Sequence, residues 1–361
     1  MPKIDAFLRI MQDVKASDLH IGNGCAPMLR IHGVLESARY KDLSEQEAKV
    51  LLYELLTDNQ IETFEKMGEL DFAYTLQGTG RFRVNLFRKH TGLAAAFRMV
   101  PEQIPTLEGL GFPETLKKML HHRQGLVLVT GPTNSGKSTT LAAMVDYLNE
   151  HSNQHIITLE DPLEFVHSNK NCLIHQRQVG EHTRSFANAL RSALREDPNV
   201  VLVGEMRDNE TISLALTAAE VGLLVLATLH TKSAAQTITR LVDAFPVDQQ
   251  TQIRLILSEV LVGICSQQLL RRTDGSGRVA ALEILVRNHA VANLIREYKP
   301  HQINNCILTG KKEGMQLMEQ HLKDLIGRNL VTVEEAARFV ENPQALLCLA
   351  KPAAASANTA P

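Results

Sequence analysis

The sequence predicts an α/β protein with a strand-helix nucleotide-binding core and a smaller α+β domain in front of it. Two observations support this prediction. From about residue 107 onward, short apolar runs alternate with helix-like runs, as in a mostly parallel sheet covered by helices. Before residue 99 the runs form a separate group of short strands and helices. Because the chain has 361 residues, it is long enough for about two domains.

The first 99 residues predict several short elements. Apolar residues at helical spacing indicate a helix over about 3–15, and alternation then indicates strands near 16–21 and 28–34. Ser44 followed by Glu47 is a capping box that begins the next helix. Further strands are expected at 71–76, 81–87 and 93–99, the first two paired across a glycine-containing turn. Residues 100–106, with two prolines, are expected to be a semi-rigid linker.

Arginines lie in or beside the strands of this first domain: Arg81, Arg83, Arg88 and Arg98. Arg81 and Arg83 share one face of the sheet, because side chains alternate along a strand. One interpretation is a solvated basic face. The other is a set of arginines presented to phosphate, which the fixed fork of guanidinium donors suits.

Residues 131–138 have the pattern G-x-x-x-x-G-K-S between an apolar run at 126–129 and a helix-like run at 139–148. A strand, this pattern and a helix form a P-loop, whose backbone N–H groups bind anionic phosphate. We expect Lys137 to reach the β- and γ-phosphates of ATP, and the Ser138 hydroxyl to hold Mg²⁺. The predicted nucleotide-binding residues are Gly131, Thr133, Asn134, Ser135, Gly136, Lys137, Ser138 and Thr139.

Acidic residues follow the next two predicted strands. The strand at 155–159 runs into three carboxylates, including Glu164, and the strand at 199–203 runs into Glu205. Open parallel sheets bind ligands at the carboxyl ends of their strands. An apolar strand that ends in an acid beside a P-loop is the Walker B pattern, in which the acid holds Mg²⁺ or orients the attacking water. We therefore expect Glu205 to serve the metal together with Ser138.

A helix is predicted at 186–195, where Arg191 and Arg195 would lie one turn apart on one face. The apolar strand at 223–227 precedes His230, which would lie on the same sheet edge as the acids. His230 is either a structural histidine or a sensor of the γ-phosphate. Beyond His230 the chain is predicted to be largely helical, with helices at 250–270, 290–298 and 315–327. The last residues, 350–361, are predicted to be disordered.

Composition narrows the class of protein. A hydrophobic content of 44% and a charged content of 22% suit a soluble globular protein, and no apolar run reaches the ~20 residues of a membrane span. The net charge of -2 and the absence of tryptophan argue against nucleic-acid binding. No signal peptide is predicted. The 5 cysteines contain no C-x-x-C pair, which argues against structural zinc and favours a reducing compartment.

Four stretches resemble, in this order, the motifs of the secretion ATPases of type II and type IV pilus systems. They are the P-loop, ITLEDPLEF at 157–165, LREDPNVVLVGEMRD at 194–208 and ATLHTKSA at 227–234, which resemble the family's Walker A, Asp box, Walker B and His box. Shorter stretches such as ASDLHI, GRFRVNLFR and CSQQLLRR resemble the retraction ATPases within that family.

The resemblance implies an overall organisation and a function. It implies a PAS-like domain at 1–99, a linker at 100–106 and a RecA-like ATPase domain with C-terminal helices at 107–349. Six copies would form a ring that uses ATP and Mg²⁺ to power pilus retraction. The implied partners are an inner-membrane pilus platform protein and a paralogous retraction ATPase, and no nucleic acid is expected. The implied location is the cytoplasmic face of the inner membrane, at the pilus base.

The resemblance also implies residue roles. Glu164 would be the general base, Glu205 the Walker B acid and His230 the phosphate sensor. Four arginines match family arginines that lie near the nucleotide or reach it when the domains close: Arg191 and Arg195 for the first group, Arg83 and Arg98 for the second.

Two positions depart from the family pattern. Retraction members have Gly where this P-loop has Asn134, although Asn tolerates left-handed backbone better than most residues. The family element A-I-R-N-L-I-R-E is AVANLIRE at 290–297, so Ala292 replaces its first arginine at what we expect to be a helix surface. An accessory or weakly active paralogue therefore stays an alternative, as does a related ring ATPase for DNA or protein transport.

Overall fold

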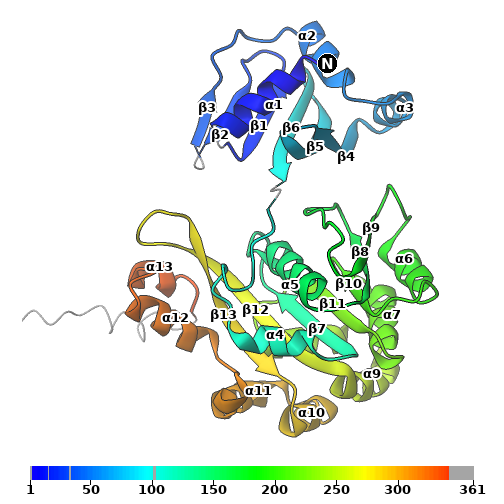
Figure 1. Cartoon of the computed structure of the whole chain (residues 1–361), viewed down its shortest axis with the longest axis vertical. Coiled ribbons are helices and arrows are strands. Elements are labelled where there is room, and N and C mark those ends of the chain that lie inside the picture. The colour runs from blue at the N-terminus through cyan, green and yellow to red at the C-terminus, as the bar shows by residue number, and fades with distance from the viewer. Residues whose placement is uncertain (1, 15, 32–33, 101–102, 341–361) are drawn as a thin grey trace, which may run out of the picture. The chain divides into compact units, whose positions relative to one another are not determined.

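A computed structural model describes residues 2–14, 16–31, 34–100 and 103–340 of the chain. The described residues form two compact units, and the chain divides between Gln103 and Ile104 (Figure 1). The tail predicted at 350–361 and the middle of the predicted linker lie outside the described residues.

The first unit is built on a six-stranded sheet of order β3-β2-β1-β6-β5-β4, in which every neighbouring pair is antiparallel. Ser44 begins a helix through the predicted capping box with Glu47. A second capping box, Thr57 with Gln60, begins α3, a helix absent from the elements that the sequence predicts. The elements are α1 (Ile4–Asp13), β1 (Asp18–Gly22), β2 (Met28–Ile31), β3 (Val34–Ser37), α2 (Glu45–Tyr53), α3 (Asp58–Met67), β4 (Glu69–Leu76), β5 (Gly80–Lys89) and β6 (Gly92–Val100).

The second unit is built on a seven-stranded sheet of order β13-β12-β7-β11-β10-β8-β9. All neighbours are parallel except β12 and β13, so the predicted α/β class is confirmed. The strands are β7 (Gly125–Thr130), β8 (His155–Glu160), β9 (Leu173–Gln178), β10 (Val200–Val203), β11 (Leu224–Leu229), β12 (Leu261–Arg271) and β13 (Arg278–Val286). The helices are α4 (Glu114–Leu120), α5 (Lys137–His151), α6 (Phe186–Ala193), α7 (Asn209–Glu220), α8 (Ala234–Asp243), α9 (Val247–Val260), α10 (His289–Arg296), α11 (Ile303–Thr309), α12 (Met318–Gly327) and α13 (Val333–Ala337), with 3₁₀ turns η1 (Pro300–Gln302) and η2 (Gly310–Glu313).

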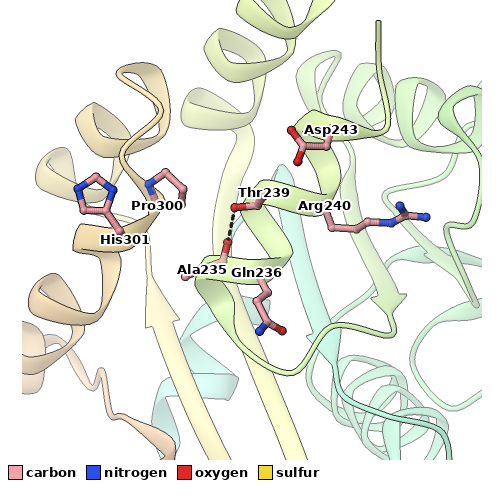
Figure 2. Close-up of a pocket in the computed structure, with 7 residues that line it drawn as sticks. All are labelled: Ala235, Gln236, Thr239, Arg240, Asp243, Pro300 and His301. Carbon is pink, nitrogen blue, oxygen red and sulfur yellow. Dashed lines mark hydrogen bonds between the residues drawn. The ribbon is translucent and has the colours of Figure 1, made fainter. Parts of the chain in front are cut away.

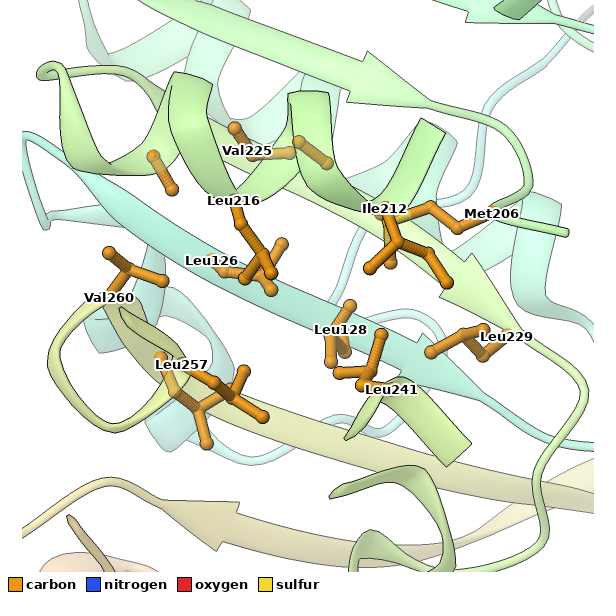
Figure 3. Close-up of a cluster of buried hydrophobic side chains, with 14 of the residues drawn as sticks. Leu126, Leu128, Met206, Ile212, Leu216, Val225, Leu229, Leu241, Leu257 and Val260 are labelled. Atoms are coloured by element: carbon orange, nitrogen blue, oxygen red, sulfur yellow. The ribbon is translucent and has the colours of Figure 1, made fainter. Parts of the chain in front are cut away.

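Helices cover both faces of this sheet, which explains the uninterrupted apolar runs of its central strands. On one face, Leu126 and Leu128 of β7 pack with Ile212 and Leu216 of α7 and with Leu257 of α9 (Figure 3). On the other face, the alternate residues of β7 pack with α4 and α5. The strand β7, and with it the start of the P-loop, is therefore fixed from both sides.

The helix predicted over 250–270 is wrong in its second half. Helix α9 ends at Val260, and the chain continues as β12 between β7 and β13. Because β12 is buried on both faces, its apolar residues do not alternate, and such a run cannot be told from a buried helix by its periodicity.

Two further expectations need correction. Helix α6 ends at Ala193, so Arg195 lies beyond the helix and does not share a helical face with Arg191. Ala292 is not on a surface: it is 1% exposed and lies on the buried side of α10, which packs on α9. Among the described residues, no helix is long and apolar enough to cross a membrane.

Candidate nucleotide site

The P-loop connects the end of β7 to the start of α5. Its backbone takes positive φ values at Gly131 (147°), Asn134 (64°) and Gly136 (89°). Asn134 thus occupies the left-handed region, the conformation that Asn tolerates better than most residues. A Cβ at Gly131 would lie 2.3 Å from the Gln267 carbonyl oxygen, so only glycine fits there. Ser135 is buried, and its Oγ has no hydrogen-bond partner among the described residues.

Lys137 begins α5 and points its ammonium group back into the loop. Its Nζ donates hydrogen bonds of 2.9 Å to the carbonyl oxygens of Gly131 and Pro132, and lies 3.5 Å from Nδ1 of His230. Burial lowers the pKa of Lys137, while the carboxylates of Glu205 and Glu164 act in the opposite direction. The ammonium is therefore a partly desolvated cation at the mouth of the helix N-terminus.

Glu205 follows β10 and His230 follows β11, so the two lie at the same sheet edge as the P-loop. One oxygen of Glu205 is 2.8 Å from Nε2 of His230, and the other is 2.8 Å from Nη2 of Arg207. Partial burial raises the pKa of Glu205, but the hydrogen bonds and charges of Arg207 and His230 outweigh it and hold the pKa below its ordinary value. With its proton on Nε2, His230 donates to Glu205 and turns Nδ1 toward Lys137. A continuous chain of polar contacts thus joins Lys137, His230 and Glu205.

The two glutamates of the Asp box have different surroundings. Glu160 accepts hydrogen bonds from Thr158 at 2.6 Å and from Gln176 at 3.2 Å, and burial raises the pKa of its carboxyl. Glu164 is exposed, in a loop whose neighbouring Leu163 N–H donates to Gln178 of β9 at 3.1 Å. Glu160 is therefore a half-buried, hydrogen-bonded group, whereas Glu164 is an accessible carboxylate close enough to act on Lys137.

Arg191 and Arg195 are not joined to this chain of contacts. Arg191 donates to Asn188 at 3.3 Å and forms an ion pair of 2.5 Å with Glu210 of α7. Arg195 is exposed beyond the end of α6. Within the described part of the chain, neither arginine contacts the P-loop, Glu205 or His230.

Arg83 and Arg98 belong to the first unit and face each other directly across β5 and β6. Two like charges at opposed positions destabilise a strand pair. The charge of Arg98 is neutralised by the buried Asp18, to which the Nε of Arg98 donates at 2.8 Å. Arg83 is exposed. Burial alone would raise the pKa of Asp18, but hydrogen bonds from Ser17 and Arg98 hold it below its ordinary value. The first unit thus presents two arginines at opposed positions of neighbouring strands.

Gln267 of β12 is absent from the site residues that the sequence predicts. Its Nε2 donates to the Ser135 carbonyl oxygen at 2.5 Å, and its Oε1 accepts from Thr140 of α5 at 2.8 Å. The sequence predicts a helix over 250–270, and from that prediction no contact between Gln267 and the P-loop could be expected. The signal that could have found it is the buried strand itself, which pairs with β7.

A cavity of about 370 Å³ lies elsewhere in the second unit, between α8 and η1 (Figure 2). Its lining residues are Ala235, Gln236, Thr239, Arg240, Asp243, Pro300 and His301. No residue of the P-loop lines it.

Comparisons with known proteins agree on one family. The family model described as "Type II/IV secretion system protein" matches residues 2–348. The chain is 49% identical over 329 residues to the type IV pilus retraction ATPase PilT of Pseudomonas aeruginosa, covering 91% of this chain and 95% of that protein. It is 36% identical over 349 residues to the type IV pilus ATPase PilU of the same bacterium, covering 97% and 91%. A crystal structure of the pilus retraction motor PilT with bound ADP matches with a TM-score of 0.88 and 44% identity, covering 94% of this chain and 98% of that one.

Proposed function

Because this chain belongs to the type II/IV secretion system protein family, we propose that it is an ATP-hydrolysing motor for the retraction of type IV pili. The observation that carries the proposal is the chain of contacts from Lys137 through His230 to Glu205, beside a P-loop of the expected conformation. The solved relative with bound ADP supports the nucleotide.

The residues present suit ATP. The partly desolvated Lys137 and the N-terminal N–H groups of α5 provide positive charge and hydrogen-bond donors for phosphate. The buried Ser135 hydroxyl has no partner in the part of the chain that the structure describes, so it is available to a phosphate oxygen. We assign ATP contacts to the predicted loop residues, with Thr133, Asn134 and Thr139 among them.

The residues also suit Mg²⁺, which prefers oxygen ligands. Ser138 supplies a hydroxyl on the first turn of α5, and Glu205 supplies a carboxylate whose low pKa keeps it ionised. When bound there, the metal would neutralise charge on the phosphates as they separate. Ser138 and Glu205 are its proposed ligands, directly or through water.

For the chemical step we propose Glu164 as the general base that orients and deprotonates the attacking water. Its exposure at the sheet edge supports this role, and the hydrogen bonds that hold Glu160 to Thr158 and Gln176 argue against that neighbour. His230 would report the state of the phosphates to Glu205 through the hydrogen bond that joins them. Arg191, Arg195, Arg83 and Arg98 would act only when domains or copies of the chain come together.

We further propose a ring of six copies at the cytoplasmic face of the inner membrane, acting on a pilus platform protein. The alternative, that this chain is an accessory paralogue, rests on the replacement of a family arginine by Ala292. The higher identity to PilT than to PilU, 49% against 36%, favours the role of a main retraction motor. Ring ATPases for DNA or protein transport remain the more distant alternative, and no nucleic-acid partner is proposed.

The test is pilus retraction in cells that lack this chain, complemented with the wild type or with Glu164→Gln. Wild type should restore retraction, and the variant should not, although it should still assemble and bind ATP. Normal retraction in the uncomplemented cells would contradict the main-motor role and favour the accessory paralogue. Salt-sensitive DNA binding by the purified protein would instead favour a transport ATPase.

A further inference from the structure

Gln267 contacts the P-loop at Ser135, although the two residues are 132 positions apart in the sequence. It lies on β12, one residue past Ser266, which is in register with Thr130 at the end of β7. The hydroxyl of Thr130 donates to the hydroxyl of Ser266 at 2.8 Å and ties the two strand ends together. Because β12 continues beyond this pair, Gln267 is level with the first residue of the P-loop.

Both functional groups of the Gln267 amide are used, and the side chain is 1% exposed. Its Nε2 donates to the carbonyl oxygen of Ser135, inside the loop, at 2.5 Å. Its Oε1 is 2.8 Å from the hydroxyl of Thr140, whose single proton it shares with the Gly136 carbonyl oxygen at 3.1 Å. One side chain therefore links the loop to the first turn of the helix that follows it.

The direction of the first hydrogen bond has a consequence for phosphate. In a planar trans peptide the C=O and the next N–H point in opposite directions. Since the Ser135 carbonyl points at Gln267, the N–H of Gly136 points away from β12, toward the inner side of the loop. The hydrogen bond thus fixes the orientation of a donor that a phosphate group would need.

The backbone of Gln267 restricts the loop as well. Its carbonyl oxygen would be 2.3 Å from a Cβ at position 131, so the strand lies directly against Gly131. Gln267 therefore lies directly against the P-loop at Gly131, and its side chain contacts the loop at Ser135 and the following helix at Thr140.

We infer that Gln267 is a positioning residue that preorganises the P-loop for nucleotide without touching the nucleotide itself. This inference rests on the proposed function, because it assumes that the loop binds ATP. Preorganisation lowers the cost of binding, since the donors need not be ordered when the ligand arrives. Losing it should weaken nucleotide binding more than it slows the chemical step.

The test compares Gln267→Met with Gln268→Met in the full chain. Methionine keeps the approximate shape of glutamine but makes neither hydrogen bond. Gln268 is the matched control, because it is also buried on β12 and its side chain points to the opposite face of the strand. ADP and ATP affinity, KM, kcat and melting temperature are measured for both variants.

Gln267→Met should raise the Kd for ADP and the KM for ATP by about tenfold, the factor that corresponds to ~1.4 kcal/mol. Its kcat should change by less than threefold, and Gln268→Met should leave Kd and KM unchanged. Thr140→Val, which removes one of the two hydrogen bonds, provides a second variant should Gln267→Met not fold. Thr140→Val should also raise the Kd for ADP, by a smaller factor than Gln267→Met.

Equal ADP affinities for Gln267→Met and Gln268→Met would overturn the inference while leaving the proposed function intact. So would a Thr140→Val variant with wild-type ADP affinity. A folded wild-type chain that binds no ATP would overturn the proposed function, and the inference with it.

Discussion

Lys137 and the pair Arg83–Arg98 are cations that the sequence assigns to the same ligand, phosphate, but the structure gives them opposite surroundings. Lys137 is 9% exposed and is held by two loop carbonyls. Arg83 is exposed, and the side chain of Arg98 is 65% exposed beside its partner Asp18. A charge in a region of low dielectric interacts strongly with an anion, whereas solvent and salt screen an exposed charge.

The difference indicates how each cation can contribute. The position of Lys137 is determined within one unit, by contacts that exist before any ligand binds. The arginine pair needs another surface to exclude water from it before its charge becomes effective. We therefore expect mutations at the P-loop to affect binding directly and mutations in the first unit to affect turnover only in the assembled protein.

The largest effect is expected for Lys137→Ala. The variant loses the desolvated ammonium that would bind the β- and γ-phosphates, and charge-assisted hydrogen bonds contribute about 1.5–3 kcal/mol each. Affinity for ATP should fall at least about 100-fold, as measured by isothermal titration calorimetry. Lys170→Ala is the control, because Lys170 forms its ion pairs with Asp146 and Glu150. If Lys137→Ala bound ATP with wild-type affinity, Lys137 would not be a phosphate-binding cation, and its contrast with the arginine pair would not hold.

The next largest effect is expected for Glu164→Gln. The variant should keep ATP bound while hydrolysis slows by roughly 10²-fold or more, the usual scale for loss of a general base. Glu160→Gln is the matched control, because burial already favours the neutral form of that carboxyl. Single-turnover hydrolysis measures both. If Glu160→Gln were the slow variant and Glu164→Gln were not, the assignment of the base would have to be reversed.

A smaller and more conditional effect is expected for Arg83→Ala. In a confirmed ring, hydrolysis should fall by up to roughly 10³-fold, the lower end of the ~10³- to 10⁵-fold that arginines supplied to a transferring phosphoryl group contribute. ATP affinity of the isolated subunit should not change. Arg88→Ala is the control, since Arg88 lies on the same strand but pairs with Glu65. An unchanged hydrolysis rate in the ring would show that Arg83 belongs to a solvated basic face.

The smallest effect is expected for Ala292→Arg, and it concerns stability. Because Ala292 is 1% exposed, a larger side chain there should cost about 1–3 kcal/mol by overpacking. The melting temperature should fall by several degrees, at about 2–4 °C per kcal/mol for a unit of this size. Asn293→Arg, at the adjacent exposed position, should leave it unchanged. An unaltered melting temperature in Ala292→Arg would show that the arginine side chain reaches solvent from this site.

Local features of the chain were predictable from the sequence. The P-loop is a strand, a turn and a helix within consecutive residues, so its pattern specifies the conformation, including the left-handed Asn134. The capping box of Ser44 and Glu47 spans four positions and forms as predicted. The shared sheet edge of Glu205 and His230 also followed, because parallel strands bring their carboxyl ends together.

Contacts between distant segments were decided only by the tertiary structure. Residues 261–271 form a strand because β7 and β13 supply hydrogen-bond partners on both sides, and this choice brings Gln267 to the P-loop. Ala292 is buried on a helix that packs on α9, a distant segment of the sequence. The periodicity of a sequence shows which residues are apolar. The segments that pack against those residues lie far away in the sequence. Those segments determine whether an apolar run becomes a strand or a helix, and which side chains come into contact.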